Sequence, residues 1–432
     1  MEQQQNQTQQ QQQQQQNKIE NQIYELKKQQ ELRFEVEFDV KGTIKLIEGS
    51  AEYFGTELSL GKTYKVTSSK GAIFTWSGCK IEVSGNVVSY IGQETPMLLY
   101  AGIHKIIDDK RTEILDKPSE SGPRVIIVGP TDAGKSSLSK MLMGYSCREG
   151  YQPVFVDLDP GQGSITLPGT ICASLIDKPI DIEEGLSNSV PFVLYYGHTS
   201  LDVNPSLFKA MIASLASNVE RRLETSEIAR ASGFIVNTCG WIDGLGYQIL
   251  LDSIQTLKAN IIVVMDNEKL YSDLANQFSS GGVVVKKLPK SGGVFLRSPV
   301  FRKKTRMSKI REYFYGINGD LCPHNVVIEF KDVVIYRTGG GPQAPMSALP
   351  IGTQSQIDPL QLSEVSPNPD IIHSILAISY TKQPQNILKS NVAGFLYVTE
   401  VNMETKKITA LAPCSGPIPS KYLLLGTLKW LE

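Results

Sequence analysis

Cysteine is scarce in this sequence, and long apolar runs are missing. The six cysteines lie far apart and form no CxxC pair, which argues against both a zinc site of the usual spacing and a disulfide framework. We expect their thiols to be reduced and mostly buried. No apolar run approaches the roughly 20 residues of a membrane span, and residues 1–18 lack the apolar core of a signal peptide. The expected class is a soluble intracellular protein with no membrane partner.

An excess of one charge is also missing. The 43 basic and 44 acidic side chains leave a net charge of -1, so the whole surface is not built to coat a nucleic acid. Any site for a polyanion must therefore be a local basic cluster. The length of 432 residues favours two or three domains, and a hydrophobic fraction of 41% can supply their cores.

The first third of the chain changes character twice. Residues 3–16 are glutamine except for Asn6 and Thr8, a composition typical of disorder, and we predict a disordered tail over residues 1–30. Short β-rich runs broken by glycine follow, and they predict a small β-sandwich or barrel over residues 31–115. A charged stretch that ends in Ser121-Gly122-Pro123 is typical of a domain boundary.

Beyond this boundary, apolar runs of about five residues alternate with helical patterns such as residues 209–230. That alternation indicates βα units around a parallel sheet, and hence an α/β domain over residues 120–316. Strand-like pieces return after Tyr315, interrupted by a Gly/Pro-rich stretch at 339–352 that we expect to form loops. We therefore predict a mainly β C-terminal domain over residues 317–432. The strands expected in the last two domains lie at residues 124–128, 154–156, 190–195, 233–236, 261–265, 325–330, 333–337, 375–379, 393–398 and 407–411.

The strongest motif follows the strand at 124–128. The segment GPTDAGKS fits the pattern GxxxxGK[ST] in its required context of strand, loop and helix. Glycines allow backbone N–H groups to turn onto phosphate oxygens, Lys135 reaches the β- and γ-phosphates, and Ser136 holds Mg²⁺. The predicted nucleotide-binding residues are Gly129, Pro130, Thr131, Asp132, Ala133, Gly134, Lys135, Ser136 and Ser137.

A metal-binding or catalytic acid is expected at the end of a neighbouring strand. Residues 154–159 supply Asp157 and Asp159 on one face of that strand. We favour Asp159, because it stands at the carboxyl end where ligands of open α/β sheets bind. It would activate a hydroxyl or hold Mg²⁺, with Gln162 as a polar orienter. The alternative is that the Asp-Pro-Gly sequence simply turns the chain.

The sequence contains no guanine-reading Asn-Lys-Xaa-Asp, which argues against a regulatory GTPase. It does contain a basic cluster, because residues 286–311 hold ten Lys and Arg side chains and no acid. Ser298-Pro299 predicts the start of a helix that reaches about Tyr313 and places Arg302 and Arg306 on one face. Such a helix can stabilise the charge of phosphoryl transfer, although a solvated basic face is the simpler reading.

Trp241 follows the strand at 233–236 and should lie on the same rim as the phosphate loop. An indole at that position could stack on a nucleobase. The alternative is that it is a core residue, which is the commoner role of a single tryptophan.

Taken together, these segments resemble the polyribonucleotide 5′-hydroxyl-kinase family, whose members double as a subunit of the pre-mRNA 3′-end cleavage complex. The resemblance covers roughly residues 31–432 and rests on the number and order of its motifs. The motifs are ELRFEV at 31–36, FGTEL at 54–58, FTW at 74–76, TPMLLY at 95–100, GPTDAGKS at 129–136, NTCGW at 237–241, LPKSGGV at 288–294 and REYFYG at 311–316.

The resemblance implies a β-sandwich N-terminal domain, a central P-loop kinase domain with a lid at 286–315, and a C-terminal domain. It implies transfer of the γ-phosphate of ATP, with Mg²⁺, to RNA 5′-hydroxyl ends. Further implied partners are other cleavage-complex subunits and the tRNA-splicing endonuclease, with a nuclear location. The implied residue roles are phosphate and Mg²⁺ binding by Lys135 and Ser136, service of the attacking hydroxyl by Asp159, RNA stacking by Trp241, lid action by Arg297, Arg302 and Arg306, and adenine contact by Glu31 and Lys70.

Two positions depart from the family pattern. Pro160 stands where valine is usual, and residues 199–204 match only loosely the family's clasp around RNA. A competing hypothesis is a catalytically silent scaffold that keeps ATP bound to lock its domains together, as in some family members.

Overall fold

The computed structural model describes residues 21–431, apart from 39, 69, 116, 118–119, 187–189, 280 and 339–357. Residues 1–20 of the predicted tail and the predicted loop at 339–352 lie outside the described residues. The chain divides into two compact units, which we describe separately. The first comprises residues up to Gly102 with Pro179–Ser187 and Ser291–Phe295, and the second comprises the rest.

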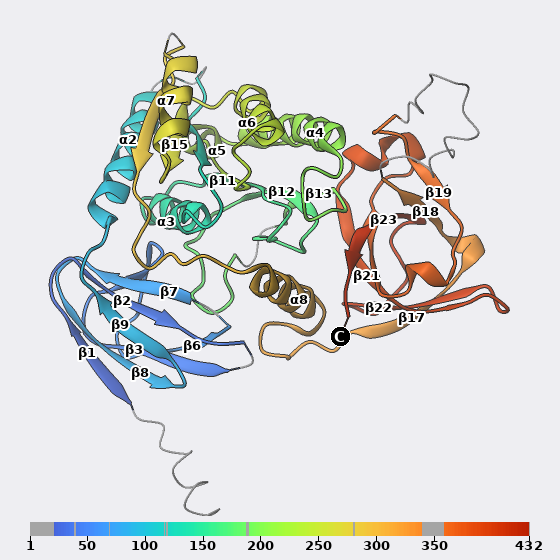
Figure 1. Cartoon of the computed structure of the whole chain (residues 1–432), viewed down its shortest axis with the longest axis horizontal. Helices are drawn as coiled ribbons and strands as arrows, with labels where there is room; N and C mark the ends of the chain where they lie inside the picture. The colour runs from blue at the N-terminus through green and yellow to red at the C-terminus, as the bar shows by residue number, and fades with distance from the viewer. Residues whose placement is uncertain are drawn as a thin grey trace, which may run out of the picture. The chain divides into compact units, whose positions relative to one another are not determined.

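The first unit is a β-sandwich, as predicted (Figure 1, blue). One sheet has the order β1-β8-β3-β6 and the other β5-β4-β7-β2-β9. Apolar side chains alternate along the strands, for example Ile44 and Leu46 in β3 and Leu32 and Phe34 in β2, and both sheets contribute to one core. The strands are β1 Gln22–Leu26, β2 Gln30–Glu35, β3 Lys41–Gly49, β4 Glu52–Tyr53, β5 Thr56–Glu57, β6 Thr63–Thr67, β7 Lys70–Thr75, β8 Cys79–Gly85 and β9 Val88–Gly92.

Two predictions at the edges of this unit are wrong. The disordered tail was predicted to reach residue 30, but Gln22–Leu26 forms β1, which pairs with β8 and buries Leu26. The first part of the charged stretch before the boundary, residues 108–115, belongs to an unpredicted helix, α2 Met97–Leu115. Its buried residues recur every three or four positions, which is a helical period: Met97, Tyr100, Ile103, Ile107, Arg111 and Ile114.

The second unit contains a seven-stranded sheet of order β13-β12-β11-β14-β10-β15-β16. Its five strands from β11 to β16 in that order are parallel, whereas β12 and β13 run antiparallel to their neighbours. The prediction of a parallel sheet is therefore correct only for that part. The chain passes from β11 to β12 without a helix, and a parallel pair needs a longer crossover. The strands are β10 Arg124–Val128, β11 Val154–Leu158, β12 Thr170–Leu175, β13 Phe192–Tyr195, β14 Phe234–Thr238, β15 Ile261–Met265 and β16 Val284–Leu288.

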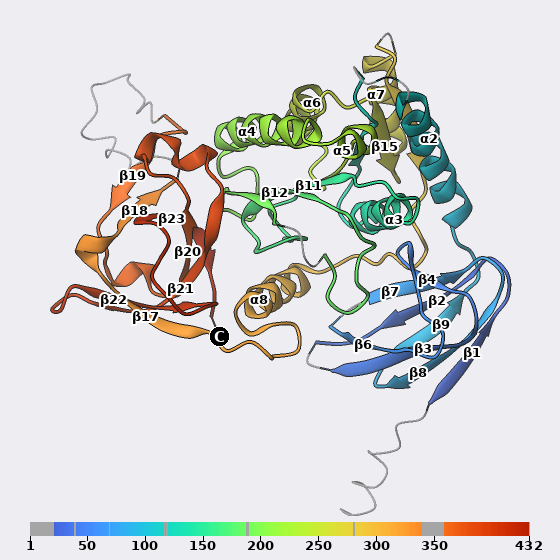
Figure 2. The ribbon, with the colours of Figure 1, turned by 180° about the vertical axis from the view of Figure 1, so that it is seen from behind.

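Helices cover both faces of this sheet. Figures 1 and 2 show α3 on the opposite side of the sheet from α4 and α6. The predicted helical region at 209–230 is two helices, because α4 ends at Leu223 and Ser226 caps the next helix by accepting a hydrogen bond from the N–H of Ala229 at 3.0 Å. The helices are α3 Lys135–Arg148, α4 Pro205–Leu223, α5 Glu227–Ser232, α6 Leu245–Thr256, α7 Glu268–Gln277 and α8 Pro299–Tyr315.

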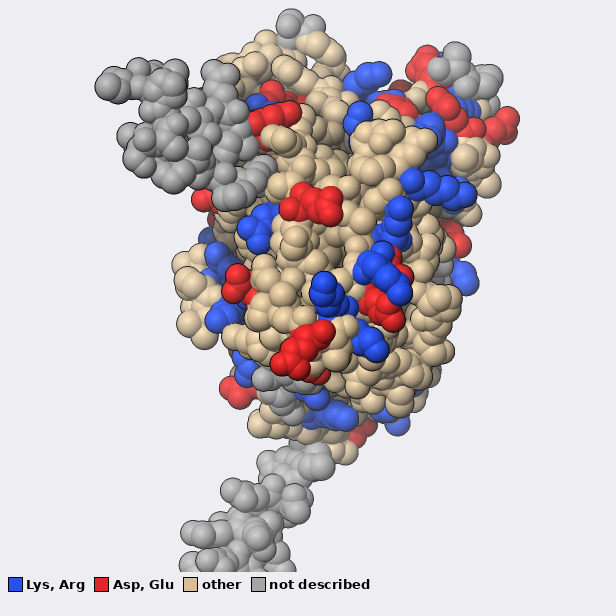
Figure 3. Space-filling view, turned by 90° about the vertical axis from the view of Figure 1, so that its right-hand side faces the viewer, with Lys and Arg blue, Asp and Glu red and all other residues tan. Residues whose placement is uncertain are grey.

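The C-terminal part of the second unit is a further seven-stranded sheet, of order β17-β22-β21-β20-β23-β18-β19. Its apolar side chains fall into two core clusters, one of which also includes residues of α8. Figure 3 views the molecule from the right-hand side of Figure 1, where this sheet lies. Acidic and basic side chains are interspersed among uncharged ones on that face. The strands are β17 His324–Glu329, β18 Val334–Arg337, β19 Ser363–Val365, β20 Ser374–Ser379, β21 Val392–Asn402, β22 Lys407–Ala412 and β23 Tyr422–Lys429, with short 3₁₀ helices η1 Phe330–Asp332, η3 Pro369–Ile371 and η4 Pro384–Lys389.

The cysteine prediction holds only in part. All six thiols are free, but Cys322 and Cys414 are exposed and only Cys79 and Cys172 are fully buried. Within the described residues, no cluster of three or more His, Cys, Asp or Glu side chains could hold a metal ion. No helix in that part of the chain combines the length and the apolar character needed to cross a membrane.

Candidate active site around the phosphate loop

The phosphate loop connects β10 to α3 as predicted, and its backbone requires glycine. Gly129 and Gly134 adopt φ of 148° and 90°, which disfavour any side chain. A Cβ on Gly129 would also lie 2.5 Å from the carbonyl oxygen of Met265. Gly134 caps α3 without a side-chain hydrogen bond, so the first N–H groups of the helix have no side chain competing for them. This is the arrangement by which a helix N-terminus receives phosphate.

Lys135 is held within the loop. Its Nζ donates hydrogen bonds to the carbonyl oxygens of Gly129 at 2.9 Å and Pro130 at 2.7 Å. Only 7% of the residue is exposed, and burial lowers the pKa of its ammonium group. An ammonium has three protons, so the geometry keeps this cation at the loop with one donor to spare.

Behind the loop, a chain of hydrogen bonds links three elements. The Ser136 hydroxyl donates to Oδ1 of Asn237 at 3.3 Å, and Nδ2 of Asn237 donates to Oδ1 of Asp157 at 3.0 Å. Asp157 and Asn237 are register partners on the neighbouring strands β11 and β14. Sequence reasoning assigned Asn237 no role. Its place at the carboxyl end of a strand beside β10 was the available signal.

The two candidate acids have different environments. Asp157 is 2% exposed, and its carboxylate also accepts the backbone N–H groups of Asp159 and Ser164, both at 3.1 Å. Asp159 lies just beyond β11 and is partly exposed, and its carboxylate accepts the N–H of Gly161 at 3.0 Å. Burial, together with the charge of Asp157, raises the pKa of Asp159 to about 6. Asp157 is thus committed to structural hydrogen bonds, whereas Asp159 can still exchange a proton with a ligand.

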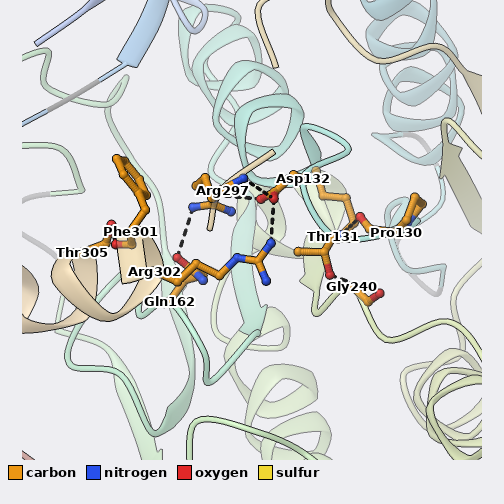
Figure 4. A network of polar contacts seen from close by, with 10 residues as sticks. Pro130, Thr131, Asp132, Gln162, Gly240, Arg297, Phe301, Arg302 and Thr305 are labelled. Carbon is orange, nitrogen blue, oxygen red and sulfur yellow. Dashed lines mark hydrogen bonds and ion pairs between the residues drawn. The ribbon is translucent and has the colours of Figure 1, made fainter. Parts of the chain in front are cut away.

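The basic lid meets the phosphate loop through Asp132 (Figure 4). The Asp132 carboxylate accepts hydrogen bonds from the backbone N–H of Arg297 at 2.9 Å, from Nε of Arg297 at 2.7 Å and from Nη2 of Arg302 at 2.7 Å. Nη1 of Arg297 also donates to Oε1 of Gln162 at 3.2 Å. Although burial opposes it, these bonds hold the pKa of Asp132 below its usual value. The structure therefore brings Asp132, Gln162, Arg297 and Arg302 together.

The third lid arginine completes a cationic group. Burial lowers the pKa of Arg306, the charge of Arg302 lowers it further, and the charge of Asp159 opposes both effects. Nε of Arg302 is buried and has no hydrogen-bond partner among the described residues. The guanidinium groups of Arg297 and Arg302 thus share the one carboxylate of Asp132, and Arg306 adds a third positive charge near Arg302 and Asp159. Such an imbalance favours binding of a further anion, and a phosphoryl group has the matching oxygens.

The lid helix forms as predicted, but the basic run does not act as one surface. Ser298 caps α8 by accepting the N–H of Phe301 at 3.1 Å, and the helix continues to Tyr315. Lys286 and Lys287 belong instead to the unpredicted strand β16. Acids from elsewhere in the chain pair with this run, for example Glu268 with Lys287 and Asp266 with Lys290. Residues 286–311 contain no acid themselves, but the fold places acids from other parts of the chain beside them.

The rim after β14 packs closely on the phosphate loop. A Cβ on Gly240 would lie 2.4 Å from Cα of Thr131, so only glycine fits there. Trp241 is partly buried and packs against the core of the sheet, and its indole covers the backbone of Gly246. The core interpretation of Trp241 is therefore correct for part of its surface, and stacking on a base by the exposed part stays a prediction.

Glu31 and Lys70 lie in the first unit. The buried carboxylate of Glu31 accepts hydrogen bonds from Nε of Arg33 at 2.6 Å and from Oγ1 of Thr95 at 2.7 Å. Lys70 pairs with Glu35, and its Nζ lies 3.5 Å from the centre of the Phe295 ring. These contacts hold both side chains in place, and their role toward adenine stays a prediction.

The strand, glycine loop, helix and arginine-bearing lid define a P-loop nucleotide-binding domain of the phosphotransferase type. Comparison with known proteins narrows this class: the chain belongs to the Clp1 family. Three family models match, described as the CLP1 P-loop of mRNA cleavage and polyadenylation factor, the pre-mRNA cleavage complex II protein Clp1, and the N-terminal β-sandwich domain of polyadenylation factor. They match residues 129–316, 321–432 and 25–114, respectively.

Relatives match over nearly their whole length. A Dictyostelium discoideum protein named as a CLP1 homolog is 65% identical over 93% of this chain and 88% of its own. The human polyribonucleotide 5′-hydroxyl-kinase Clp1 is 40% identical over 95% of this chain and 96% of its own. A solved complex of Clp1p with part of Pcf11p matches with a TM-score of 0.83 and 26% identity, over 96% of this chain and 99% of that one.

Proposed function

We propose that this protein is an ATP-dependent polyribonucleotide 5′-hydroxyl-kinase that is also a subunit of the pre-mRNA 3′-end cleavage complex. The observation that carries the kinase proposal is the meeting of the lid arginines with the phosphate loop at Asp132, close to the available acid Asp159. A domain that only binds nucleotide needs no such cationic lid. The names of the human and chicken relatives support the same activity.

In this proposal each side chain has a role in transferring the γ-phosphoryl group. Asp159 accepts the proton of the RNA 5′-hydroxyl as its oxygen bonds to the γ-phosphorus, and the bond to the β,γ-bridging oxygen breaks to release ADP. Lys135 binds the β- and γ-phosphates. Arg297, Arg302 and Arg306 stabilise the negative charge on the transferred group. The backbone N–H groups of the loop would donate hydrogen bonds to the phosphate oxygens.

A magnesium ion fits this donor set. Mg²⁺ is usually bound by one or two protein oxygens together with phosphates and water, and the hydroxyl of Ser136 and the carboxylate of Asp159 are the protein oxygens we propose for it. When bound, the ion would offset the negative charge of the phosphates. Asp157 is the less suitable ligand because Asn237 and two backbone N–H groups already occupy its oxygens.

We propose the remaining contacts with nucleotide and substrate on the basis of the resemblance to the family. Residues 129–137 hold the phosphates, and Glu31 and Lys70 contact the adenine. Gln162 orients the substrate end, with Arg297 bound to its amide oxygen, and Trp241 stacks on an RNA base. We also propose the domain boundaries 31–115, 120–316 and 317–432.

We propose cleavage-complex subunits as protein partners, since the solved Clp1p structures are complexes with Pcf11p. A second matching structure concerns an extended interface between these two proteins and the loss of ATP in a point mutant, with a TM-score of 0.84. The tRNA-splicing endonuclease is a further proposed partner. Work in pre-mRNA cleavage implies a nuclear location.

Transfer of labelled phosphate from ATP tests the kinase proposal. The purified full chain should label a 5′-hydroxyl oligoribonucleotide, and Lys135→Ala should reduce labelling at least about 100-fold because it removes the cation that binds the γ-phosphate. A 5′-phosphorylated oligonucleotide is the matched substrate control. An oligodeoxyribonucleotide of the same sequence separates RNA from DNA preference. Undiminished labelling by Lys135→Ala would overturn the proposal.

A second candidate is the catalytically silent ATP-binding scaffold. One finding supports it: the second matching structure addresses the Clp1p–Pcf11p interface together with the loss of ATP in a point mutant. In that case ATP should co-purify with the protein and stay unhydrolysed when 5′-hydroxyl RNA is added. Removal of the nucleotide should then release Pcf11p-type partners, because a ligand stabilises the state to which it binds.

A further inference from the structure

The lid helix α8 has two halves with different surroundings. The half that begins at Pro299 carries Arg302 and Arg306 and reaches Asp132 of the phosphate loop. The other half buries Ile310 and Phe314 completely, at 0% exposed. These two residues belong to a core cluster that includes strands β20, β21 and β23 of the C-terminal sheet. One continuous helix therefore connects the reaction site to that sheet.

Aromatic rings and a hydrogen bond fix the buried half. The ring of Phe314 stacks on the indole of Trp430, with centroids 5.8 Å apart and planes 9° apart. The Tyr313 hydroxyl accepts the backbone N–H of Phe395 in β21 at 3.0 Å. The ring of Tyr313 also meets that of Phe395 edge-on at 5.4 Å. The helix is thus held by apolar, aromatic and polar contacts at once.

The sheet side of this contact is itself held in place. The backbone N–H of Trp430 donates to the carbonyl oxygen of His373 at 2.9 Å. The Tyr397 ring packs edge-on against the Trp430 indole at 4.8 Å, and its hydroxyl lies 2.8 Å from Nδ1 of His373. Trp430 is 2% exposed, so it cannot change rotamer without disturbing the core.

The two ends of α8 are held unequally. At the site, the residue of α8 that binds Asp132 is Arg302, whose side chain is 30% exposed although that of Asp132 is only 1% exposed. A single ion pair that water can reach from one side contributes little compared with apolar burial. At the other end, two large apolar side chains are fully removed from water. The buried end therefore decides where the helix lies. Arg302 stands twelve residues before Phe314, about 18 Å along the axis, so a small tilt at the anchor displaces the guanidinium.

We propose that the C-terminal sheet positions the lid arginines for phosphoryl transfer, with Trp430, Phe314 and Tyr313 as positioning residues. The inference rests on the proposed kinase function. Electrostatic stabilisation of a transition state depends on donors fixed in advance, and loss of geometry alone can cost two orders of magnitude in rate. The C-terminal domain then contributes to catalysis because it holds the lid arginines in position.

Trp430→Leu in the full chain tests this positioning role. The expected result is a kcat for RNA phosphorylation lowered about tenfold, with the KM for ATP unchanged within about twofold because the phosphate loop is intact. Tyr313→Phe removes one hydroxyl and should lower kcat less, about two- to threefold. Trp430→Phe keeps an aromatic ring on Phe314 and should recover most of the activity.

Leu376→Ala is the matched control. Leu376 is 0% exposed in the other core cluster of the same sheet, which contains no residue of α8. It should lower thermal stability as Trp430→Leu does and leave kcat unchanged at a temperature where both variants are folded. Equal losses of kcat in Leu376→Ala and Trp430→Leu would overturn the proposal, because they would show general destabilisation.

Hydrogen–deuterium exchange tests the same positioning role without a measurement of kinase activity. Amides of residues 299–306 should exchange faster in Trp430→Leu than in the wild type and in Leu376→Ala. Unchanged exchange there would overturn the proposal. If the wild-type protein transfers no phosphate, the kinase function fails, and the exchange result still decides whether the sheet positions the lid.

Discussion

At the scale of single residues, two aspartates that look equivalent in the sequence have different hydrogen-bond partners in the site. Asp157 and Asp159 share a strand face, but the fold gives Asp157 an amide and two backbone N–H partners and leaves Asp159 with fewer. The sequence could predict Asp159 from its place at the strand end. It could not predict why Asp157 is excluded, because Asn237 is brought in by the pairing of β11 with β14.

The pKa of Asp159 sets a pH dependence. A general base must be ionised, and burial raises the pKa of this carboxyl to about 6. The kcat/KM for ATP·Mg²⁺ reports the enzyme before metal and nucleotide bind, so we expect it to be constant above pH 7 and to fall roughly tenfold per pH unit below about 6, as the carboxylate becomes protonated. In the complex, a magnesium ion bound to Asp159 would lower this pKa. Steady-state kinetics between pH 5 and 8 measure this limb. A limb near pH 4, where an ordinary carboxyl titrates, would contradict the assignment, and Asp159→Asn should be nearly inactive at every pH.

Asp132 holds the lid at the loop, and its substitution by asparagine isolates the charge. The backbone of Asp132 has φ of 57°, a conformation that asparagine tolerates, so the loop should keep its shape. Asp132→Asn should lower kcat about tenfold, since Arg297 and Arg302 lose a charged acceptor, and change the Kd of ATP little. Glu268→Gln, which removes the partner of Lys287 in β16, is the control and should have wild-type kinetics. An unchanged kcat in Asp132→Asn, or an equal loss of kcat in Glu268→Gln, would contradict this account of the lid.

At the scale of elements, sequence patterns predicted the parts with strong local signals. The strand Arg124–Val128, the phosphate loop and the start of α8 at Ser298-Pro299 agree with the structure. The helix α2 was missed because its apolar positions are spread among charged residues. The strand β16 was missed because lysine occupies both of its exposed positions. Local composition could not show that acids such as Asp132 and Glu268 would neutralise part of the basic run.

The segment after β14 packs tightly against the phosphate loop at Gly240, and ATP binding should depend on this packing. A methyl group at Gly240 would meet Cα of Thr131 at 2.4 Å, so the loop must shift, and such overpacking costs about 1–3 kcal/mol. We expect Gly240→Ala to weaken ATP binding about 10- to 100-fold by titration calorimetry. Gly281→Ala is the control, because its nearest neighbour would lie 3.9 Å away, and equal affinities of the two variants would contradict the packing argument.

At the scale of the whole molecule, the order of the predicted regions was readable from the sequence, but their contacts were not. Nothing local indicates that Phe314 of the lid meets Trp430 near the end of the chain. Nor does local pattern show that β12 runs antiparallel to both of its neighbours, β11 and β13. Family motifs supplied the activity, since the phosphate loop alone implies only nucleoside triphosphate binding.

The identity of the labelled product tests the central claim most directly. The protein is incubated with ATP labelled at the γ-phosphate and a 5′-hydroxyl oligoribonucleotide, and the RNA is digested to 5′-mononucleotides. The account predicts that the label appears only in the mononucleotide from the 5′ end, and that Lys135→Ala and Asp159→Asn yield almost none. RNA that stays unlabelled while the wild-type protein retains bound ATP would contradict it.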